Sequence, residues 1–302
     1  MKTIVTGAFR TTEEELNILR SLGLDITLHQ DERQPVEHPE QYEAAICNGL
    51  FLYNDIRAFT GLKYIQLTSA GLDRVPMDYI LTNGIEIHNA RGVYSGPMAE
   101  FAIWGVLELY KQGRFFADNQ RQHRWEKHRG LMELAGKTVC IVGCGSVGSE
   151  CAKRFSAFNC RVLGIDIETR TQLYFESVQT LNCLPDVLPQ SDIVVLTLPL
   201  TETTRHLFSE TLFQQIKTGA VIVNIARGPI LDTQALIKAL NTKLSGAVLD
   251  VFEEEPLDKN SPLWDLDNVI ITPHNSFVGE GNHGRLTDLI IENLTSFDSL
   301  GD

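Results

Sequence analysis

A glycine-rich turn between two apolar runs constrains the fold of this chain more than any other stretch. The run 138–142 leads into Gly143-Cys144-Gly145-Ser146-Val147-Gly148, an amphipathic segment follows, and a second run ends in Asp166. A strand, a tight turn, a helix and a second parallel strand form the βαβ unit that binds dinucleotides. Glycine triplets also occur in ordinary turns, but the flanking runs and the acid favour a dinucleotide site.

Each residue of the turn has a distinct expected role. Gly143 permits a tight exit from the strand, Gly145 lets the backbone approach a pyrophosphate, and Gly148 lets the helix pack closely on the strand. The free N–H groups at the start of the helix, which includes Ser146 and Val147, favour a negative charge. These five residues are therefore predicted to bind the cofactor.

The carboxylate of Asp166 indicates which cofactor binds. It stands 18 residues after Gly148, where it can accept hydrogen bonds from a ribose 2′-hydroxyl and would repel a 2′-phosphate. NAD is therefore the predicted cofactor. Arg170 is close enough in sequence to reach a phosphate, so preference for NADP stays open as an alternative.

Composition excludes several classes of protein. With 302 residues, 43% of them hydrophobic, the chain can form two domains with sizeable cores. A net charge of −13 argues against nucleic acid or an anionic membrane surface as a partner. No apolar stretch is long enough to span a bilayer, and the start lacks the apolar core of a signal peptide, so we expect a cytoplasmic protein. The six cysteines form no zinc pattern; no metal is predicted, and we expect buried, reduced thiols.

Apolar runs alternate with helical or loop segments on both sides of the glycine turn. Before it they lie at 3–5, 25–28, 44–47, 64–67 and 85–87, and after Asp166 at 193–196, 220–223, 247–249 and 269–271. This alternation predicts two α/β domains with mostly parallel sheets, one of which lacks a glycine fingerprint. A long buried helix is expected from Ser95, a basic surface at 121–129 is read as solvated or as a subunit contact, and residues 279–300 are expected to be helical.

Three chemically useful side chains follow the last strands. Arg227, an acidic run at 253–255, and His274 each come directly after an apolar run. Because ligands bind beyond the carboxyl ends of parallel strands, we expect them to converge on one edge of the sheet. A guanidinium binds a carboxylate, an imidazole transfers a hydroxyl proton, and a carboxylate orients the ring. The set predicts hydride transfer between a cofactor and a carbon that carries a hydroxyl or keto oxygen.

Each member of this set also has an ordinary structural explanation. Surface ion pairs, solvated acidic loops and structural histidines are all common, and only the coincidence on one edge favours catalysis. The other seven histidines lack such neighbours in the motifs, and we expect them to be structural.

The motifs together resemble the D-isomer-specific 2-hydroxyacid dehydrogenase family. They are the glycine turn with Asp166, Val-Asn-Ile-Ala-Arg-Gly at 223–228, Leu-Asp-Val-Phe at 249–252 leading to Glu255-Pro256, and Thr-Pro-His at 272–274, with further matches at 69–73 and 95–100. The resemblance implies that Arg227 binds substrate, that His274 is the acid/base and that Glu255 is its partner. It implies cofactor contacts at Pro199, Ala226 and Asp250, and substrate contacts at Ala70, Gly71, Tyr94 and Arg227.

The resemblance also implies an architecture. A doubly wound dinucleotide-binding domain, residues 98–275, would join a smaller, discontinuous, flavodoxin-like α/β substrate domain made of residues 1–97 and 276–302. Hinges near residues 97 and 276 and a homodimer formed largely through the cofactor domain are further implications.

Two departures from the family's pattern bear on the substrate. Asn275-Ser276-Phe277 replaces the usual small residues after His274, and the loop 47–51 lacks the arginines of phosphoglycerate-type members. Without cations there, the negative charge of a phosphate would be poorly compensated.

We therefore expect an NAD-dependent 2-keto acid reductase for a small or apolar 2-keto or 2-hydroxy acid, with Leu50, Phe51, Tyr94 and Phe277 as pocket walls. The alternatives are a non-enzymatic, NAD-sensing scaffold similar to corepressors of this fold and an NADP-preferring glyoxylate or hydroxypyruvate reductase.

Overall fold

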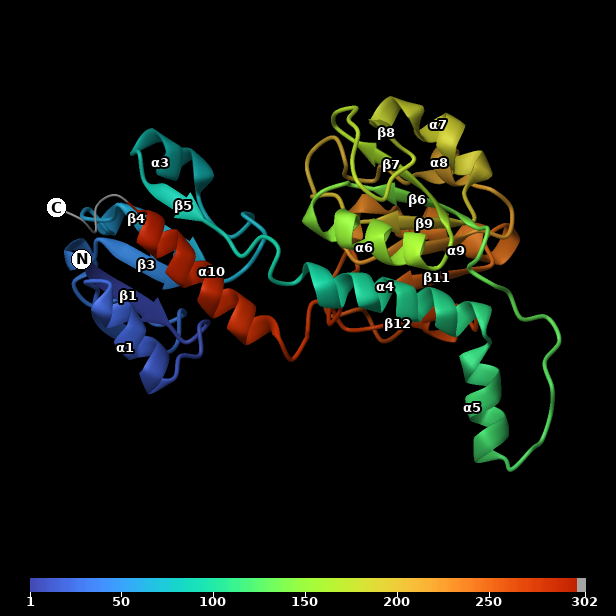
Figure 1. Ribbon diagram of the computed structural model, residues 1–302, viewed down its shortest axis with the longest axis horizontal. Coiled ribbons are helices and arrows are strands. Elements are labelled where there is room, and N and C mark those ends of the chain that lie inside the picture. The colour runs from blue at the N-terminus through green and yellow to red at the C-terminus, as the bar shows by residue number, and fades with distance from the viewer. Residues whose placement is uncertain (298–302) are drawn as a thin grey trace. The chain divides into compact units, whose positions relative to one another are not determined.

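The chain forms two compact units in the computed structural model, which describes residues 1–297 (Figure 1). The first unit contains Met1–Tyr94 together with Gly279–Asp302, and the second contains Ser95–Val278. The structure thus divides after Tyr94 and Val278, whereas the expected divisions fall after residues 97 and 275. Each unit has its own sheet and its own buried core, and the two are described separately.

The second unit is a doubly wound sheet of seven parallel strands. The strands are β6 (Thr138–Val142), β7 (Arg161–Asp166), β8 (Ser177–Thr180), β9 (Ile193–Leu196), β10 (Val221–Asn224), β11 (Gly246–Leu249) and β12 (Val269–Ile271). Their order is β12-β11-β10-β9-β6-β7-β8, so the chain changes direction between β6 and β9. This is the point at which ligands bind in open α/β sheets.

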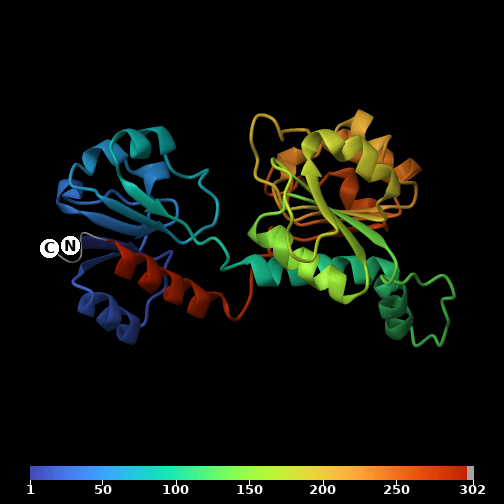
Figure 2. The ribbon, with the colours of Figure 1, turned by 45° about the horizontal axis from the view of Figure 1, so that its top comes forward.

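Helices bury both faces of this sheet (Figure 2). Helix α4 (Ser95–Tyr110) and helix α6 (Ser146–Ala157) cover one face, and α7 (Leu184–Val187), α8 (Glu210–Phe213) and α9 (Thr233–Thr242) contribute to the core on the other. Gly105 lets α4 approach β11 closely, because a Cβ there would lie 2.5 Å from Val248 Cγ1. Helix α5 (Gly113–Arg121) and the connection after it project away from the sheet.

The first unit is a smaller parallel sheet in the flavodoxin-like order β2-β1-β3-β4-β5, which confirms the expected fold class. Its strands are β1 (Lys2–Thr6), β2 (Asp25–His29), β3 (Ala44–Cys47), β4 (Tyr64–Leu67) and β5 (Glu86–His88). Its helices are α1 (Glu13–Ser21), α2 (Leu50–Tyr53), α3 (Met77–Thr82) and α10 (Asn282–Ser296). The C-terminal helix α10 packs on this unit through Leu286, Ile290 and Leu294. Residues 298–300 of the predicted helix lie outside the described residues.

Short 3-10 helices complete the connections. They are η1 (Pro39–Gln41), η2 (Ile56–Ala58), η3 (Leu181–Cys183), η4 (Leu188–Gln190), η5 (Gly228–Ile230) and η6 (Pro262–Asp265). Among the helices of residues 1–297, none has both the length and the apolar character needed to cross a membrane.

Candidate active site

The glycine turn lies at the crevice between β6 and β9. Gly143 has a φ of +99°, and a Cβ there would lie 2.5 Å from the backbone nitrogen of Leu198. A Cβ at Gly148 would lie 2.1 Å from the carbonyl oxygen of Gly143. Thr197 donates to that same oxygen at 2.6 Å, so the loop after β9 is fixed against the turn. Two of the three glycines are therefore required by packing.

The third glycine, Gly145, borders open space. A Cβ at Gly145 would have no neighbour within 4 Å, and this residue precedes α6 without a side-chain cap. The first N–H groups of a helix have no intrahelical acceptors, and here they include those of Ser146, Val147 and Gly148. The exposed turn and the positive end of the helix dipole fit a pyrophosphate.

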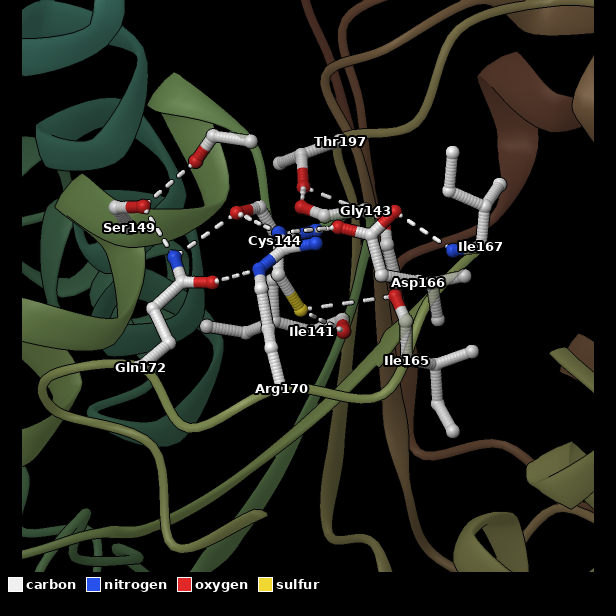
Figure 3. A network of polar contacts seen from close by, with 12 residues as sticks. Ile141, Gly143, Cys144, Ser149, Ile165, Asp166, Ile167, Arg170, Gln172 and Thr197 are labelled. Atoms are coloured by element: carbon white, nitrogen blue, oxygen red, sulfur yellow. Dashed lines mark hydrogen bonds and ion pairs between the residues drawn. The ribbon is translucent and has the colours of Figure 1, made fainter. Parts of the chain in front are cut away.

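Asp166 ends β7 beside this turn. Its carboxylate accepts hydrogen bonds from the backbone N–H groups of Cys144 at 3.1 Å and Ile167 at 2.7 Å, and it forms a 2.6 Å ion pair with Arg170 (Figure 3). The Cys144 side chain is buried, and burial raises the pKa of its thiol to about 12. Cys144 is therefore an inert part of the turn, as a structural cysteine should be.

Arg227 follows β10 in a turn that a buried amide holds. The side chain of Asn224 accepts a hydrogen bond from the Ala226 N–H at 3.1 Å and donates to the Arg227 carbonyl at 3.0 Å. A Cβ at Gly228 would lie 1.9 Å from the carbonyl carbon of Phe252, so this turn packs directly on the acidic loop. The role of Asn224 was missed from the sequence, although a polar residue at the end of a buried run was a signal.

His274 and Glu255 form a close pair. His274 Nδ1 lies 2.8 Å from Glu255 Oε2, while the other carboxylate oxygen accepts the Phe252 N–H at 3.1 Å. An ionised carboxylate only accepts, so Nδ1 carries the proton and Nε2 is left for chemistry. The imidazole is 40% exposed, which leaves it accessible to a small molecule.

Asp250 fixes the loop that carries His274. Its carboxylate is fully buried and accepts from the Thr272 hydroxyl at 2.7 Å and from the N–H groups of Asn275 at 2.7 Å and Ser276 at 2.9 Å. Its carbonyl oxygen accepts the His274 N–H at 2.8 Å. The sequence suggested only a cofactor contact for Asp250, and the structure adds this positioning role.

Other histidines also have acidic partners, so a neighbouring carboxylate alone does not distinguish His274. His206 Nε2 lies 2.5 Å from Glu253 Oε1, and His283 Nε2 lies 2.7 Å from Glu15 Oε1. What distinguishes His274 is its position directly after β12, on the loop held by Asp250.

Among the predicted substrate residues of the first unit, Ala70 and Gly71 follow β4 and Tyr94 follows β5. Asn89 donates to the carbonyl of Ala70 at 2.7 Å, and Ser69 donates to that of Gly71 at 3.2 Å. The Tyr94 hydroxyl donates to the carbonyl of Thr68, and burial raises the pKa of this tyrosine. These hydrogen bonds hold the backbone of the loop that contains the exposed residue Ala70.

Leu50, Pro199 and Phe277, three further predicted positions, differ in how exposed they are. Leu50 is completely buried in the core of the first unit, so its side chain is not a pocket wall as expected. Pro199 is exposed after β9, and its carbonyl accepts from the Thr204 hydroxyl at 2.8 Å. Phe277 is 41% exposed and meets the His274 ring edge-to-face, with 6.2 Å between centroids.

The sheet order, the glycine turn and the acid at the end of β7 are those of a dinucleotide-binding α/β protein. Residues 103–276 match the family described as D-isomer specific 2-hydroxyacid dehydrogenase, NAD binding domain. The chain belongs to this family, and it is an oxidoreductase that acts on 2-hydroxy acids with NAD as its cofactor.

Named relatives and similar solved structures support the assignment of the chain to this family. The chain is 36% identical over 246 residues to a glyoxylate reductase of Thermofilum pendens, covering 78% of this chain and 72% of that protein. A glyoxylate reductase structure from Paecilomyes thermophila has a TM-score of 0.83 at 25% identity and covers 100% of this chain and 96% of its own. A D-lactate dehydrogenase of Aquifex aeolicus, complexed with NAD and lactic acid, has a TM-score of 0.78 at 25% identity, over 98% and 95%.

Proposed function

We propose that this dehydrogenase works mainly as a reductase of glyoxylate or of another 2-keto acid with a small or apolar side chain. The observation that carries the proposal is the 2.8 Å contact between His274 Nδ1 and Glu255, which leaves Nε2 available as a proton donor. The glyoxylate reductases among its relatives support a small substrate.

Three side chains carry the proposed reaction. The Arg227 guanidinium binds the substrate carboxylate and polarises the neighbouring carbonyl. His274 donates a proton from Nε2 to the oxygen that becomes the hydroxyl, and Glu255 stabilises the charged imidazole and fixes its orientation. NADH, when bound, supplies the hydride. In the opposite direction His274 accepts the hydroxyl proton.

We assign the other predicted site residues to the cofactor and to the substrate. We assign the pyrophosphate to Gly145, Ser146, Val147 and Gly148, and the ribose to Asp166. Pro199, Ala226 and Asp250 are proposed to line the rest of the cofactor site. The first unit is proposed to be the substrate domain, where Ala70 and Gly71 offer backbone N–H groups to the substrate carboxylate and Tyr94 is a further contact.

Steady-state kinetics of NADH oxidation test this function. Glyoxylate, pyruvate, hydroxypyruvate, 2-ketoisocaproate, oxaloacetate and 3-phosphohydroxypyruvate form the panel, and chiral analysis should show D products where the product is chiral. His274→Gln is expected to lower kcat by about 10²–10⁴-fold, the usual contribution of a general acid, with NADH binding retained.

A matched control comes from the second histidine–glutamate pair of the same unit. His206→Gln removes an imidazole paired with Glu253, and it should leave kcat within about twofold of the unaltered chain because this ring has no assigned role. Near-normal turnover by His274→Gln would refute the proposed acid. A highest kcat/KM for 3-phosphohydroxypyruvate would refute the substrate class, and tight NADH binding without turnover of any keto acid would favour the scaffold alternative.

We also propose a homodimer formed through the second unit. The groove between α4 and α6 is lined by Ile103, Leu107 and the half-exposed rings of Trp104 and Phe158. Exposed apolar surface of this kind marks an interface, and a second copy would cover it symmetrically. Light scattering should give twice the chain mass, and Trp104→Glu should shift the mass toward the monomer.

The projecting segment is a second part of the proposed interface. Trp125 is almost fully exposed, and an exposed aromatic side chain of this size favours contact with a second copy here.

We further propose a cytoplasmic location, since all six cysteines are free thiols. Formation of disulfides during native purification without reductant would argue against that location.

A further inference from the structure

Arg170 lies over the glycine turn in a fixed position. Its Nη2 is 2.6 Å from Asp166 Oδ2 and 3.0 Å from the carbonyl oxygen of Cys144, and its Nε donates to Gln172 Oε1 at 2.8 Å (Figure 3). The guanidinium is therefore held by a carboxylate, a backbone carbonyl and a side-chain amide, all beside the predicted cofactor ribose.

Gln172 attaches this arrangement to the turn and to α6. Its Nε2 donates to the carbonyl of Cys144 at 2.9 Å and to the Ser149 hydroxyl at 2.7 Å. Gln172 is thus a positioning residue for Arg170. A guanidinium that is already oriented loses less conformational freedom when it binds a ligand.

The ion pair changes what Asp166 presents to a cofactor. Three donors, the N–H groups of Cys144 and Ile167 and the guanidinium of Arg170, occupy the carboxylate, which has about four acceptor positions. The negative charge that would repel a 2′-phosphate is compensated by a cation at 2.6 Å. An Asp166 that pairs with Arg170 is therefore a weaker barrier to NADP than an isolated acid.

Arg170 also has donors left for a phosphate. Its side chain is 38% exposed, and its Nη1 has no acceptor within the described part of the chain. Guanidinium groups bind phosphate through paired N–H donors, and an arginine near this acid is the usual means of accommodating a 2′-phosphate.

We propose that Arg170 gives this enzyme dual cofactor use. It neutralises Asp166 and binds the 2′-phosphate of NADPH, whereas the 2′-hydroxyl of NADH competes with Arg170 for the same carboxylate. The inference rests on the dinucleotide site of the proposed function and concerns which nucleotide that site accepts.

Calorimetric titration of the full chain with NADH and with NADPH tests the inference. The unaltered chain should bind both, with dissociation constants within about tenfold of each other. Arg170→Gln should weaken NADPH binding by about tenfold or more, the effect expected for a lost charged hydrogen bond, without weakening NADH. Arg170→Lys should recover part of the NADPH affinity, and raising the salt concentration should weaken NADPH more than NADH.

Arg161→Gln is the matched control. Arg161 begins β7 and pairs with Glu176 at 2.6 Å, so this change removes an equivalent ion pair at the other end of the same strand. It should leave the ratio of the two dissociation constants unchanged. An equal ratio in Arg170→Gln and the unaltered chain would overturn the proposal, as would failure of the unaltered chain to bind NADPH. Because binding is measured without a keto acid, absence of turnover would count against the proposed reaction alone.

Discussion

Gly145 and Gly148 lie three residues apart but meet different surroundings. A Cβ at Gly148 would lie 2.1 Å from the Gly143 carbonyl, whereas a Cβ at Gly145 would meet nothing within 4 Å. We therefore expect Gly148→Ala to lower the free energy of unfolding by about 2 kcal/mol, a typical cost of overpacking. Gly145→Ala should change it by less than about 0.5 kcal/mol yet weaken NADH binding, because its methyl group would occupy the site.

Urea unfolding and NADH titration of both variants check this contrast. Ala239→Gly, a change within helix α9, serves as the reference for helix destabilisation. A glycine with a positive φ, such as Gly84 at 66°, cannot serve as a glycine-to-alanine control because alanine would be strained there. The cost of Ala239→Gly is expected to be about 1 kcal/mol or more. Normal NADH affinity in Gly145→Ala would contradict the assignment of the open side of the turn to the pyrophosphate.

The sequence predicted residues by their place after strands and missed residues that act through distant partners. Arg227, an acid within 253–255 and His274 were predicted because the carboxyl ends of parallel strands meet at one edge, and the family resemblance singled out Glu255. The three hydrogen bonds that the Asp250 carboxylate accepts involve residues 272–276, and nothing in its own motif specified them. The contact from Gln172 to Ser149 spans 23 residues and depends on how the loop after β7 folds back.

At the scale of elements, Asp192 connects the two strands that border the cofactor crevice. It directly precedes β9, accepts the Thr138 N–H of β6 at 3.0 Å and pairs with Lys217 at 2.7 Å. Burial of the carboxyl favours its neutral form, but Lys217 and the Thr138 N–H outweigh this and lower the pKa of Asp192. The folded state therefore binds this proton less readily than the unfolded chain does.

The sign of the pH dependence follows from that lowered pKa. The stabilisation by Asp192 is fully present above its unfolded pKa of about 3.9 and is lost as pH falls through the lower folded value. Asp192→Asn should therefore cost about 1 kcal/mol at pH 7, and the difference should shrink below about pH 4. Urea unfolding at several pH values measures it, with the exposed Asp186→Asn as control. A difference that persists undiminished below the folded pKa would contradict this account.

Most elements were predictable because they are apolar, and the exceptions are polar. The runs at 44–47, 64–67, 193–196 and 269–271 coincide with β3, β4, β9 and β12. Strand β8, Ser-Val-Gln-Thr, was missed because it lies at the sheet edge and only Val178 is buried. Helix α5 was missed because it projects from the sheet and buries little besides Asn119, so no apolar stripe marked it.

At the scale of the whole molecule, each unit has a core that its own segments complete. The core of the first unit combines Val5 and Leu19 from the start of the chain with Leu286, Ile290 and Leu294 of α10. Glu15 adds a polar connection, since it accepts from the Thr287 hydroxyl at 2.9 Å and pairs with His283. The C-terminal helix is therefore an integral part of the first unit, although 184 residues of the second unit separate it from Tyr94.

Separate cores predict that the two units respond separately to mutation and to cofactor. Ile290 is completely buried in the first unit, so Ile290→Ala should destabilise that unit by about 3 kcal/mol through lost packing. NADH binds the second unit and should stabilise it by mass action. Scanning calorimetry should therefore show one transition lowered by Ile290→Ala and a different one raised by NADH. A single transition that both changes shift together would show that the units unfold as one cooperative body.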